Sequence, residues 1–489
     1  MNISARVNRF PFLAAPPPVF RAGTTFPASS SPLAAGPSSD EKGLRGPTWL
    51  IRRSLRVCTA EGIAAEVVTA CAGGAVLTGW ALHLGCGPLL VGLVVALPQL
   101  AQLVQLPAAW STSLLGHRRA ALWMVGLSRQ ALLPLVALPF LPIGDGAKRA
   151  ILVAVAALSA ILGVAGNNAW TAWMGELVPR GIRGRFFGRR TAVCMLGGAL
   201  ASAAAGAFLD RLRATGHAAT AFSALAFAAC LAGALTSWLM RQQHDPAPHA
   251  SRAPFDLRDA LRPFRDPSYR AALGYQVGWN CATGLASSYF ALHMLKNLGM
   301  GFTLIALHGT CVAALRVLVA PLWGRAIDRV GARPVLLTCS FGVSIIPLLW
   351  LFPRRDFLWP IALDVVLSGL LWGGHAIAIF ALPLAVAPRR GRPFYLAAFA
   401  MAGGVAFSAS TAAAGALAEW LPSTLVFAGR SYANLQLLFA LSSAARLCAA
   451  FYGARISEPG SRTLPEALRL LPVLEPLRAR FAALQAVRR

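Results

Sequence analysis

The sequence predicts an all-α polytopic membrane protein with about twelve transmembrane helices, arranged as two parallel repeats of six. Three observations lead to this prediction. Hydrophobic residues make up 56% of the chain and charged residues only 13%, whereas a soluble globular chain carries about 25% charged residues. Apolar runs of membrane-spanning length follow one another along the chain. Loop motifs of the first half recur in the second half about 210 residues later.

Each apolar run is long enough to cross a bilayer as a helix. About 20 helical residues span the hydrocarbon core, and a helix satisfies its own backbone hydrogen bonds there. The runs cover residues 57–82, 88–109, 119–142, 150–174, 191–209, 218–240, 271–295, 302–323, 334–352, 358–387, 394–418 and 432–454. An even number of crossings places both termini on the same side of the membrane.

Arginine is concentrated in alternate loops, which indicates the orientation by the positive-inside rule. The basic loops include residues 179–190, 325–333 and 389–392. We expect these loops and both termini to be cytoplasmic, in the inner (plasma) membrane of the cell. The run 179–190 could bind lipid phosphate or act as a gate, but retention of the loop at the headgroups is the favoured interpretation.

The formal net charge of +27 could suggest a nucleic-acid partner. The basic residues lie in short clusters between apolar runs, and neither a basic face nor a recognition motif accompanies them. Attraction to a bilayer with anionic headgroups explains the charge better. The nine cysteines form no C-x-x-C pair, so we interpret them as small buried hydrophobic residues.

The segments outside and between the runs differ in composition. The first 45 residues are rich in Pro, Ser and Ala, which is typical of a disordered tail or of a start codon placed too early. Apolar residues near one helical face after residue 254 predict a short surface helix in the central linker. The predicted organisation is a tail at 1–55, a six-helix bundle at 56–241, a cytoplasmic linker at 242–270, a second six-helix bundle at 271–454 and an amphipathic cytoplasmic tail at 455–489.

The two bundles repeat one another in their loops. Residues 84–90 resemble residues 298–304, and residues 116–118 resemble residues 331–333. Six helices per repeat is an even number, so both halves have the same orientation in the membrane. The expected relation is therefore a twofold axis along the membrane normal.

A loop motif lies between the eighth and ninth runs. Residues 324–333 read Gly-Arg-Ala-Ile-Asp-Arg-Val-Gly-Ala-Arg, which resembles the G-x-x-x-D-R-x-G-R-R signature of the major facilitator superfamily. The matching positions are Gly324, Asp328, Arg329, Gly331 and Arg333. The resemblance covers about residues 55–455 and implies a loop that latches the two halves together on the cytoplasmic side.

The corresponding loop of the first half departs from this signature. Ala109, Ser113 and Leu114 stand where Gly, Asp and Arg are expected. Of the basic and glycine positions, Gly116 and Arg118 are retained. The sequence therefore predicts a complete latch motif in the second half alone.

Ionisable residues inside the apolar runs are expensive to bury and are candidates for function. Glu61 is expected to be an interfacial anchor or to pair with Arg56. Glu66 lies deeper, where it could be a substrate or proton site, or could form a salt bridge with Arg129 or Arg316. An arginine buried without a partner would be costly, so both arginines are expected to pair with carboxylates or carbonyls.

The family resemblance implies that the first, fourth, seventh and tenth helices line a central cavity. On those helices we expect the substrate-binding residues to be Glu66, Asn167, Asn168, Gln276, Trp279, Asn280, Trp372 and His375. Amides in an apolar helix must find a partner, the tryptophans could stack on a ring-shaped solute, and His375 could carry a coupled proton. Asp364 lies toward the outer end and is a weaker candidate.

These features predict a secondary active transporter that moves a small solute by alternating access, driven by a proton or sodium gradient. No phosphate-binding loop points to ATP, and we expect a monomer with no cofactor, no metal and no enzymatic activity. Two alternatives remain open. A membrane-embedded enzyme acting on a lipid-like substrate would need a catalytic constellation facing the cavity. A transporter-like scaffold or sensor would be favoured by a closed, apolar cavity.

Overall fold

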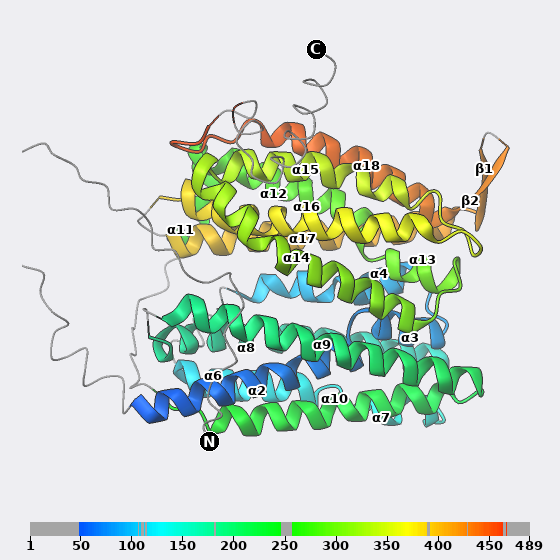
Figure 1. Ribbon diagram of the computed structural model, residues 1–489. Coiled ribbons are helices and arrows are strands. Elements are labelled where there is room, and N and C mark those ends of the chain that lie inside the picture. Colours follow the sequence, from blue (N-terminus) through cyan, green and yellow to red (C-terminus); the bar gives the residue numbers. More distant parts are fainter. Residues whose placement is uncertain are drawn as a thin grey trace, which may run out of the picture. The chain divides into compact units, whose positions relative to one another are not determined.

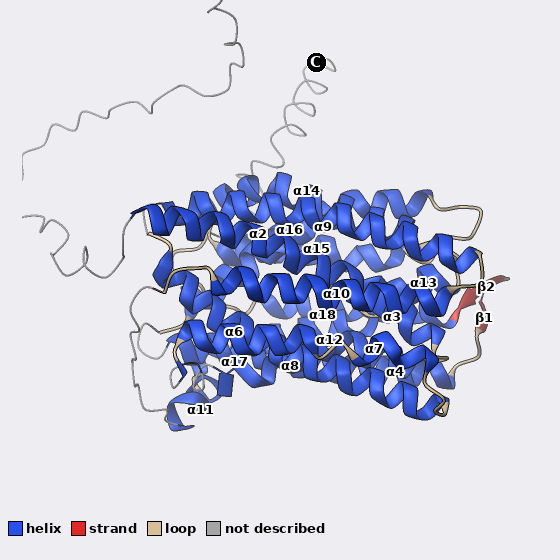
Figure 2. Cartoon of the chain, turned by 90° about the horizontal axis from the view of Figure 1, so that it is seen from below, coloured by secondary structure: helices blue, strands red, loops and turns tan. Residues whose placement is uncertain are grey.

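The computed structural model describes residues 48–105, 107–108, 112, 115–179, 182–245, 257–388, 392–427, 429–462 and 466. Figure 2 shows that helices dominate this part of the chain. The first half contains α2 (Thr48–Ala72), α3 (Gly74–His83), α4 (Pro88–Leu100), η1 (Ala101–Val104), α6 (His117–Gln130), α7 (Pro134–Ala137), η2 (Leu138–Phe140), α8 (Asp145–Leu177), α9 (Arg183–Ala214) and α10 (Ala218–Arg241).

The second half follows the linker helix α11 (Leu257–Arg265). It contains α12 (Pro267–Ser287), α13 (Phe290–Lys296), α14 (Phe302–Val330), α15 (Ala332–Leu349), α16 (Trp359–Val386), α17 (Arg392–Trp420) and α18 (Asn434–Gly453). An antiparallel hairpin of β1 (Thr424–Phe427) and β2 (Arg430–Ala433), which the sequence analysis did not predict, connects α17 to α18.

The predicted fold class is confirmed, with a difference in how the crossings are built. Within the described residues, ten helical segments are long and apolar enough to cross a membrane. The second predicted run becomes a shorter apolar helix at Pro88–Val104. The seventh run divides into α12 and α13, and α12 carries Arg270, Gln276 and Asn280, which lower its hydropathy. The first helix, α2, begins at Thr48, inside the segment predicted as a tail.

Helix packing repeats from one half to the other. In the first half α2 packs against α9 and α10, and α6 packs against α8 and α10. In the second half α12 packs against α17 and α18, and α15 packs against α16 and α18. Between the halves, α9 contacts α14 and α17 contacts α4, as Figure 1 shows for α9 and α14. Each contact in one half therefore has its counterpart in the other, as two parallel repeats require.

Equivalent helices are interrupted at equivalent depths. The first crossing breaks between α2 and α3, where Gly74 has a φ of +49° that favours glycine. The seventh crossing breaks between α12 and α13, at Ser288 and Tyr289. Gly73, Gly74, Ser287 and Ser288 line one cavity. Interrupted helices are a common way to present backbone polar groups to a solute.

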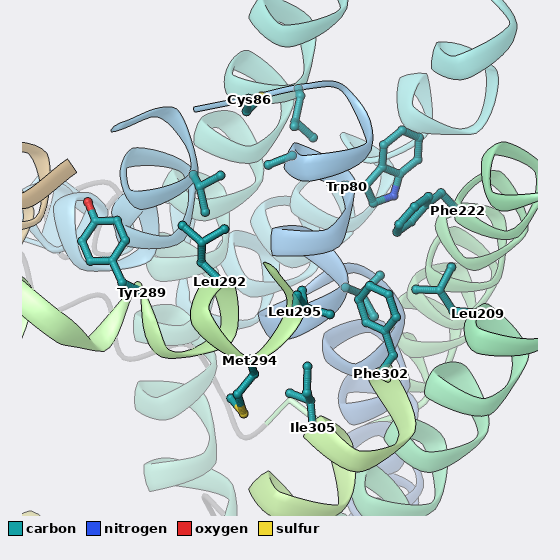
Figure 3. Packing of buried hydrophobic residues seen from close by; sticks show 14 of the residues in the cluster. Trp80, Cys86, Leu209, Phe222, Tyr289, Leu292, Met294, Leu295, Phe302 and Ile305 are labelled. Atoms are coloured by element: carbon teal, nitrogen blue, oxygen red, sulfur yellow. The ribbon is translucent and has the colours of Figure 1, made fainter. Parts of the chain in front are cut away.

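The two halves meet in a hydrophobic cluster at the end of the bundle where α4 and α14 begin, which we call the outer end after the expected topology. Trp80 and Phe222 of the first half have ring centroids 5.1 Å apart, and Phe302 of the second half lies 6.4 Å from Phe222. Leu292 and Leu295 of α13 complete this contact (Figure 3). Burial of this apolar surface stabilises the closed outer end.

Two carboxylates at the outer end cap helices of the opposite half. Asp210, in the last turns of α9, accepts hydrogen bonds from the backbone N–H groups of Phe302 (2.8 Å) and Thr303 (2.9 Å) at the start of α14. Glu419, near the end of α17, accepts one from the backbone N–H of Leu89 (3.1 Å) at the start of α4. A carboxylate at a helix N-terminus satisfies free N–H groups and interacts favourably with the helix dipole.

Replacing Asp210 with alanine should weaken closure of the outer end. The loss of an N-terminal cap costs about 1–2 kcal/mol, which corresponds to about a 5- to 30-fold shift in the equilibrium between closed and open forms. A cysteine introduced at Ala306, which lines the cavity inside this closure, should then react faster with an impermeant maleimide added from the outer side. Asp145→Ala, at the start of α8, is the matched control. Equal labelling rates in the two variants would contradict a capping role for Asp210.

The junction between the linker and the second half is held by one aspartate. Asp266 caps α12 by accepting a hydrogen bond from the Ser268 backbone N–H (2.9 Å), and the Tyr395 hydroxyl of α17 donates to its other oxygen (2.6 Å). These hydrogen bonds, that from Tyr395 above all, hold the pKa of the Asp266 carboxyl below its usual range. The contact fixes the beginning of α12 beside that of α17.

Candidate functional site

The described residues enclose a series of cavities between and within the halves. One of about 780 Å³ is lined by α2 and α9 of the first half and by α12, α13 and α14 of the second. A second, of about 710 Å³, lies among α12, α14 and α16. His308, Gly309, Ala313 and Ser287 line both, so the two cavities adjoin. Each is large enough for a metabolite-sized solute.

Five of the predicted substrate-binding residues line the second-half cavity. They are Gln276, Trp279, Asn280, Trp372 and His375. Asn280 is held by a hydrogen bond from its amide to the Gln276 carbonyl oxygen (2.9 Å). The side-chain oxygen of Gln276 is buried and has no hydrogen-bond partner in the described structure, so it is available to a donor group on a solute.

An aromatic wall forms one side of this cavity. The Trp279 ring stacks on Tyr275 with centroids 5.8 Å apart and on His375 at 4.6 Å, and Trp372 meets Trp279 edge to face at 6.0 Å. The Tyr275 hydroxyl is 3.1 Å from Nε2 of His375 and 2.7 Å from Oγ of Ser340. His375 is buried and lines the cavity through its contact with Trp279, and its Nε2 is within hydrogen-bond distance of the Tyr275 hydroxyl.

Asp364, the weaker candidate from the sequence, lines the second-half cavity and pairs with His308 there. Its side chain is buried, and its Oδ2 lies 2.7 Å from Nε2 of His308 on α14. The Ser368 hydroxyl donates to the other oxygen at 2.9 Å. His308 lines both large cavities, so this acid–imidazole pair lies where the two cavities adjoin.

Two arginines, Arg316 and Arg446, line the same cavity. The sequence singles out Arg316 but not Arg446. Arg316, which is expected to pair with a carboxylate or with backbone carbonyls, has its guanidinium 5.9 Å from the Trp372 ring centroid. Arg446 of α18, which was not considered, lies 5.6 Å from the same ring. The signal for Arg446 was present in the sequence, because it is a charged residue inside the last apolar run.

The first half holds an ion cluster around Glu61. Glu61 is buried, and its carboxylate lies 3.2 Å from Arg190 and 4.0 Å from Arg129. Arg190 also stacks on Trp170 with its guanidinium carbon 4.6 Å from the ring centroid. Two expectations are corrected here, since Glu61 pairs with neither Arg56 nor the headgroups, and Arg190 of the basic run points into the protein.

The remaining predicted site residues belong to the first half and do not line the second-half cavity. Glu66 is half-buried and lines both the large shared cavity and a smaller one of about 300 Å³ around Glu61. Asn167 lines that smaller cavity and, with Asn168, another of about 270 Å³. Of the two alternatives for Glu66, the salt bridge with Arg129 or Arg316 is not formed within the described part of the chain, and Arg129 pairs with Glu61 instead.

The latch motif packs against the C-terminal segment of its own half. Gly331 has a φ of +99° between α14 and α15. Glu458 accepts hydrogen bonds from the backbone N–H of Ala332 (3.0 Å) and of Arg333 (2.7 Å), and the Arg333 guanidinium donates to the Ala454 carbonyl (2.7 Å). The other three motif positions, Gly324, Asp328 and Arg329, lie in the last turns of α14, with both charged side chains exposed.

The first-half loop repeats part of this geometry. Gly116 has a φ of +82°, and the Arg118 guanidinium donates to the Arg241 carbonyl at 2.7 Å, as Arg333 does to Ala454. Ala109, Ser113 and Leu114 lie outside the described residues. The retained glycine and arginine thus fix the start of α6 to the end of α10, whether or not a latch accompanies them.

Comparison with known proteins agrees with this fold. Residues 271–482 match the model of the Major Facilitator Superfamily. Over these residues, the chain resembles that family. Among solved structures of similar fold, a D-xylose-proton symporter is 15% identical, with a TM-score of 0.64 and coverage of 85% of this chain and 100% of the symporter. No curated protein matches the sequence significantly.

Two further solved structures have a similar fold. A structure of the nucleoside transporter NupG is 12% identical, with a TM-score of 0.61 and coverage of 84% of this chain and 100% of that one. The xylose transporter XylE from E. coli, in an inward open conformation, is 13% identical, with a TM-score of 0.61 and coverage of 86% and 100%. At these identities the likeness concerns the fold alone.

Proposed function

We propose that this chain is a major facilitator superfamily protein and a secondary active transporter, which carries a small solute across the plasma membrane by alternating access. The observation that supports this most is a pair of adjoining cavities bounded by both halves, at the inner side of a contact that closes the outer end. Their largely apolar lining carries Glu66 and Gln99 from the first repeat and Asp364, Arg316, Arg446, Gln276 and Asn280 from the second. A scaffold without transport would be favoured by a closed apolar cavity, and this lining favours a solute instead.

The proposed driving ion is the proton, and Asp364 with His308 is the proposed coupling pair. A carboxylate and an imidazole 2.7 Å apart can share or release a proton according to what occupies the adjoining space. Both side chains line a cavity on the inner side of the closed outer end. Binding and release of the proton would therefore follow the rocking of the halves. With the basic loops cytoplasmic, the closed outer end corresponds to an inward-facing conformation.

The test is solute uptake by proteoliposomes under an imposed pH gradient. A thermal-shift screen of metabolite classes supplies the solutes, and each hit is then offered as a labelled compound. We expect Asp364→Asn to lower gradient-driven accumulation by at least about tenfold, since removal of a proton site removes coupling. Glu176→Gln is the matched control, because Glu176 also pairs with a histidine, His117 at 2.9 Å, away from the cavity. Accumulation that follows a sodium gradient, or that survives Asp364→Asn, would overturn proton coupling through this pair.

A further inference from the structure

The second-half cavity contains a cation whose hydrogen-bonding capacity is unused. Arg446 is 1% exposed, and its Nε and Nη2 atoms have no hydrogen-bond partner among the described residues. A buried guanidinium in this state is expensive, because it has lost water without gaining acceptors. Proteins keep such a group where a ligand supplies the missing acceptors.

Arg316 presents a second guanidinium to the same space. Both arginine side chains line the cavity, and both lie within 6.0 Å of the Trp372 ring centroid, Arg316 at 5.9 Å and Arg446 at 5.6 Å. They approach one ring from α14 and α18 respectively. An acidic group beside Trp372 would therefore lie near both cations, and the guanidinium fork is the group that binds carboxylate and phosphate groups most strongly.

The charges in this cavity do not balance. Its charged lining residues are Arg316, Arg446 and Asp364, so two positive charges face one negative charge, a net of +1 with His308 neutral. Asp364 is already engaged by His308 and Ser368. In the first half, by contrast, Arg129 and Arg190 share their small cavity with Glu61 and Glu66, which balances the charge there. The excess positive charge is thus a property of the second half.

We infer that the solute is an organic anion that carries a flat ring, with its acidic group near Arg316 and Arg446 and its ring beside Trp372, the partly exposed member of the aromatic wall. This inference rests on the proposed transport function. The cavity of about 710 Å³ exceeds the need of an inorganic anion and suits a ring with polar substituents. The free oxygen of Gln276 and the amide of Asn280, from α12, would recognise those substituents across the cavity.

Four small probes that share a phenyl ring test whether binding requires a negative charge on the ligand. Benzoate and phenyl phosphate are anionic, benzyl alcohol is neutral and benzylamine is cationic. Binding is measured on the full chain in lipid nanodiscs by quenching of tryptophan fluorescence. We expect both anions to bind and the neutral and cationic probes to bind about 10- to 100-fold more weakly, as expected for the loss of a charge-assisted hydrogen bond. The ratio of the two anion affinities distinguishes a carboxylate site from a phosphate site.

Variants separate a binding role for Arg446 from a structural one. Arg446→Met removes an unsatisfied buried charge, so thermal stability without ligand should rise or stay unchanged while anion binding falls about 10- to 100-fold. Arg446→Lys keeps the positive charge but loses the paired N–H donors of the guanidinium, so it should retain part of the anion affinity. Arg316→Gln should weaken anion binding without affecting benzyl alcohol. A large loss of stability in Arg446→Met, with anion affinity unchanged in Arg316→Gln, would overturn the inference.

The inference and the proposed function fail in different ways. If benzylamine or benzyl alcohol binds as well as benzoate and is transported, the anion assignment is wrong and the transporter proposal stands. If the anions bind at Arg316 and Arg446 but no anion crosses the membrane of proteoliposomes, the anion site stands and the transport proposal is wrong.

Discussion

Replacing Gly415 with leucine should prevent the outer end from closing and abolish net transport. Gly415 of α17 lies against the backbone of α4, where a Cβ atom would approach the Cα of Leu89 to 2.6 Å. Gly206 of α9 is its counterpart, since a Cβ atom there would lie 2.9 Å from the carbonyl carbon of Phe302. A branched side chain at either position must separate the halves, and overpacking of this kind costs about 1–3 kcal/mol.

That energy is enough to shift the equilibrium toward the outward-open form by about 5- to 150-fold. The variant should still bind solute added from the outer side, because the cavity residues are unchanged. The measurement is maleimide labelling of Ala306→Cys from the outer side, combined with uptake into proteoliposomes. Gly188→Leu is the control, because a Cβ atom at Gly188 would meet open space. Normal uptake by Gly415→Leu would show that α17 and α4 need not approach closely for transport.

The second large effect concerns stability. Glu61→Gln should destabilise the first half by about 3–5 kcal/mol, because it leaves the guanidinium groups of Arg129 and Arg190 buried without their carboxylate. Thermal unfolding of the purified protein, followed by tryptophan fluorescence, should show a clearly lower midpoint. Glu66→Gln makes the same change one and a half turns along α2, at a half-buried residue that lines the same small cavity but forms no ion pair within the described residues, and should have a smaller effect. Equal midpoints for the two variants would mean that the Glu61 cluster contributes little.

The helices were predictable because lipid leaves the backbone few alternatives. Runs of apolar residues long enough to cross a bilayer must form helices, and the loop repeats placed those helices in two equivalent bundles. The helix breaks at Gly74 and Ser288 were harder to predict from the sequence. A glycine pair permits a positive φ but does not require one, and residues 286–289 read Ala-Ser-Ser-Tyr, which gives no strong helix-stop signal.

The site was harder to predict because long side chains reach between helices. Arg446 belongs to α18, a helix that the family resemblance does not place at the cavity, yet its guanidinium extends to Trp372. Arg190 belongs by sequence to a basic loop. Because α9 begins at Arg183, that arginine lies about two turns inside the helix and faces Glu61. The sequence places Arg446 inside the last apolar run and Arg190 in a basic loop, and only packing shows which neighbour each one meets.

The central claim is that the two halves rock about the cavity, so that opening at one end closes the other. Spin-label pairs measure this directly, one pair at outer positions Arg213 and Lys296 and one at inner positions Arg185 and Arg325, all exposed and each pair joining opposite halves. In Gly415→Leu, relative to the parent chain, the outer distance should lengthen and the inner distance should shorten. A longer outer distance with an unchanged inner distance would contradict alternating access by these two repeats.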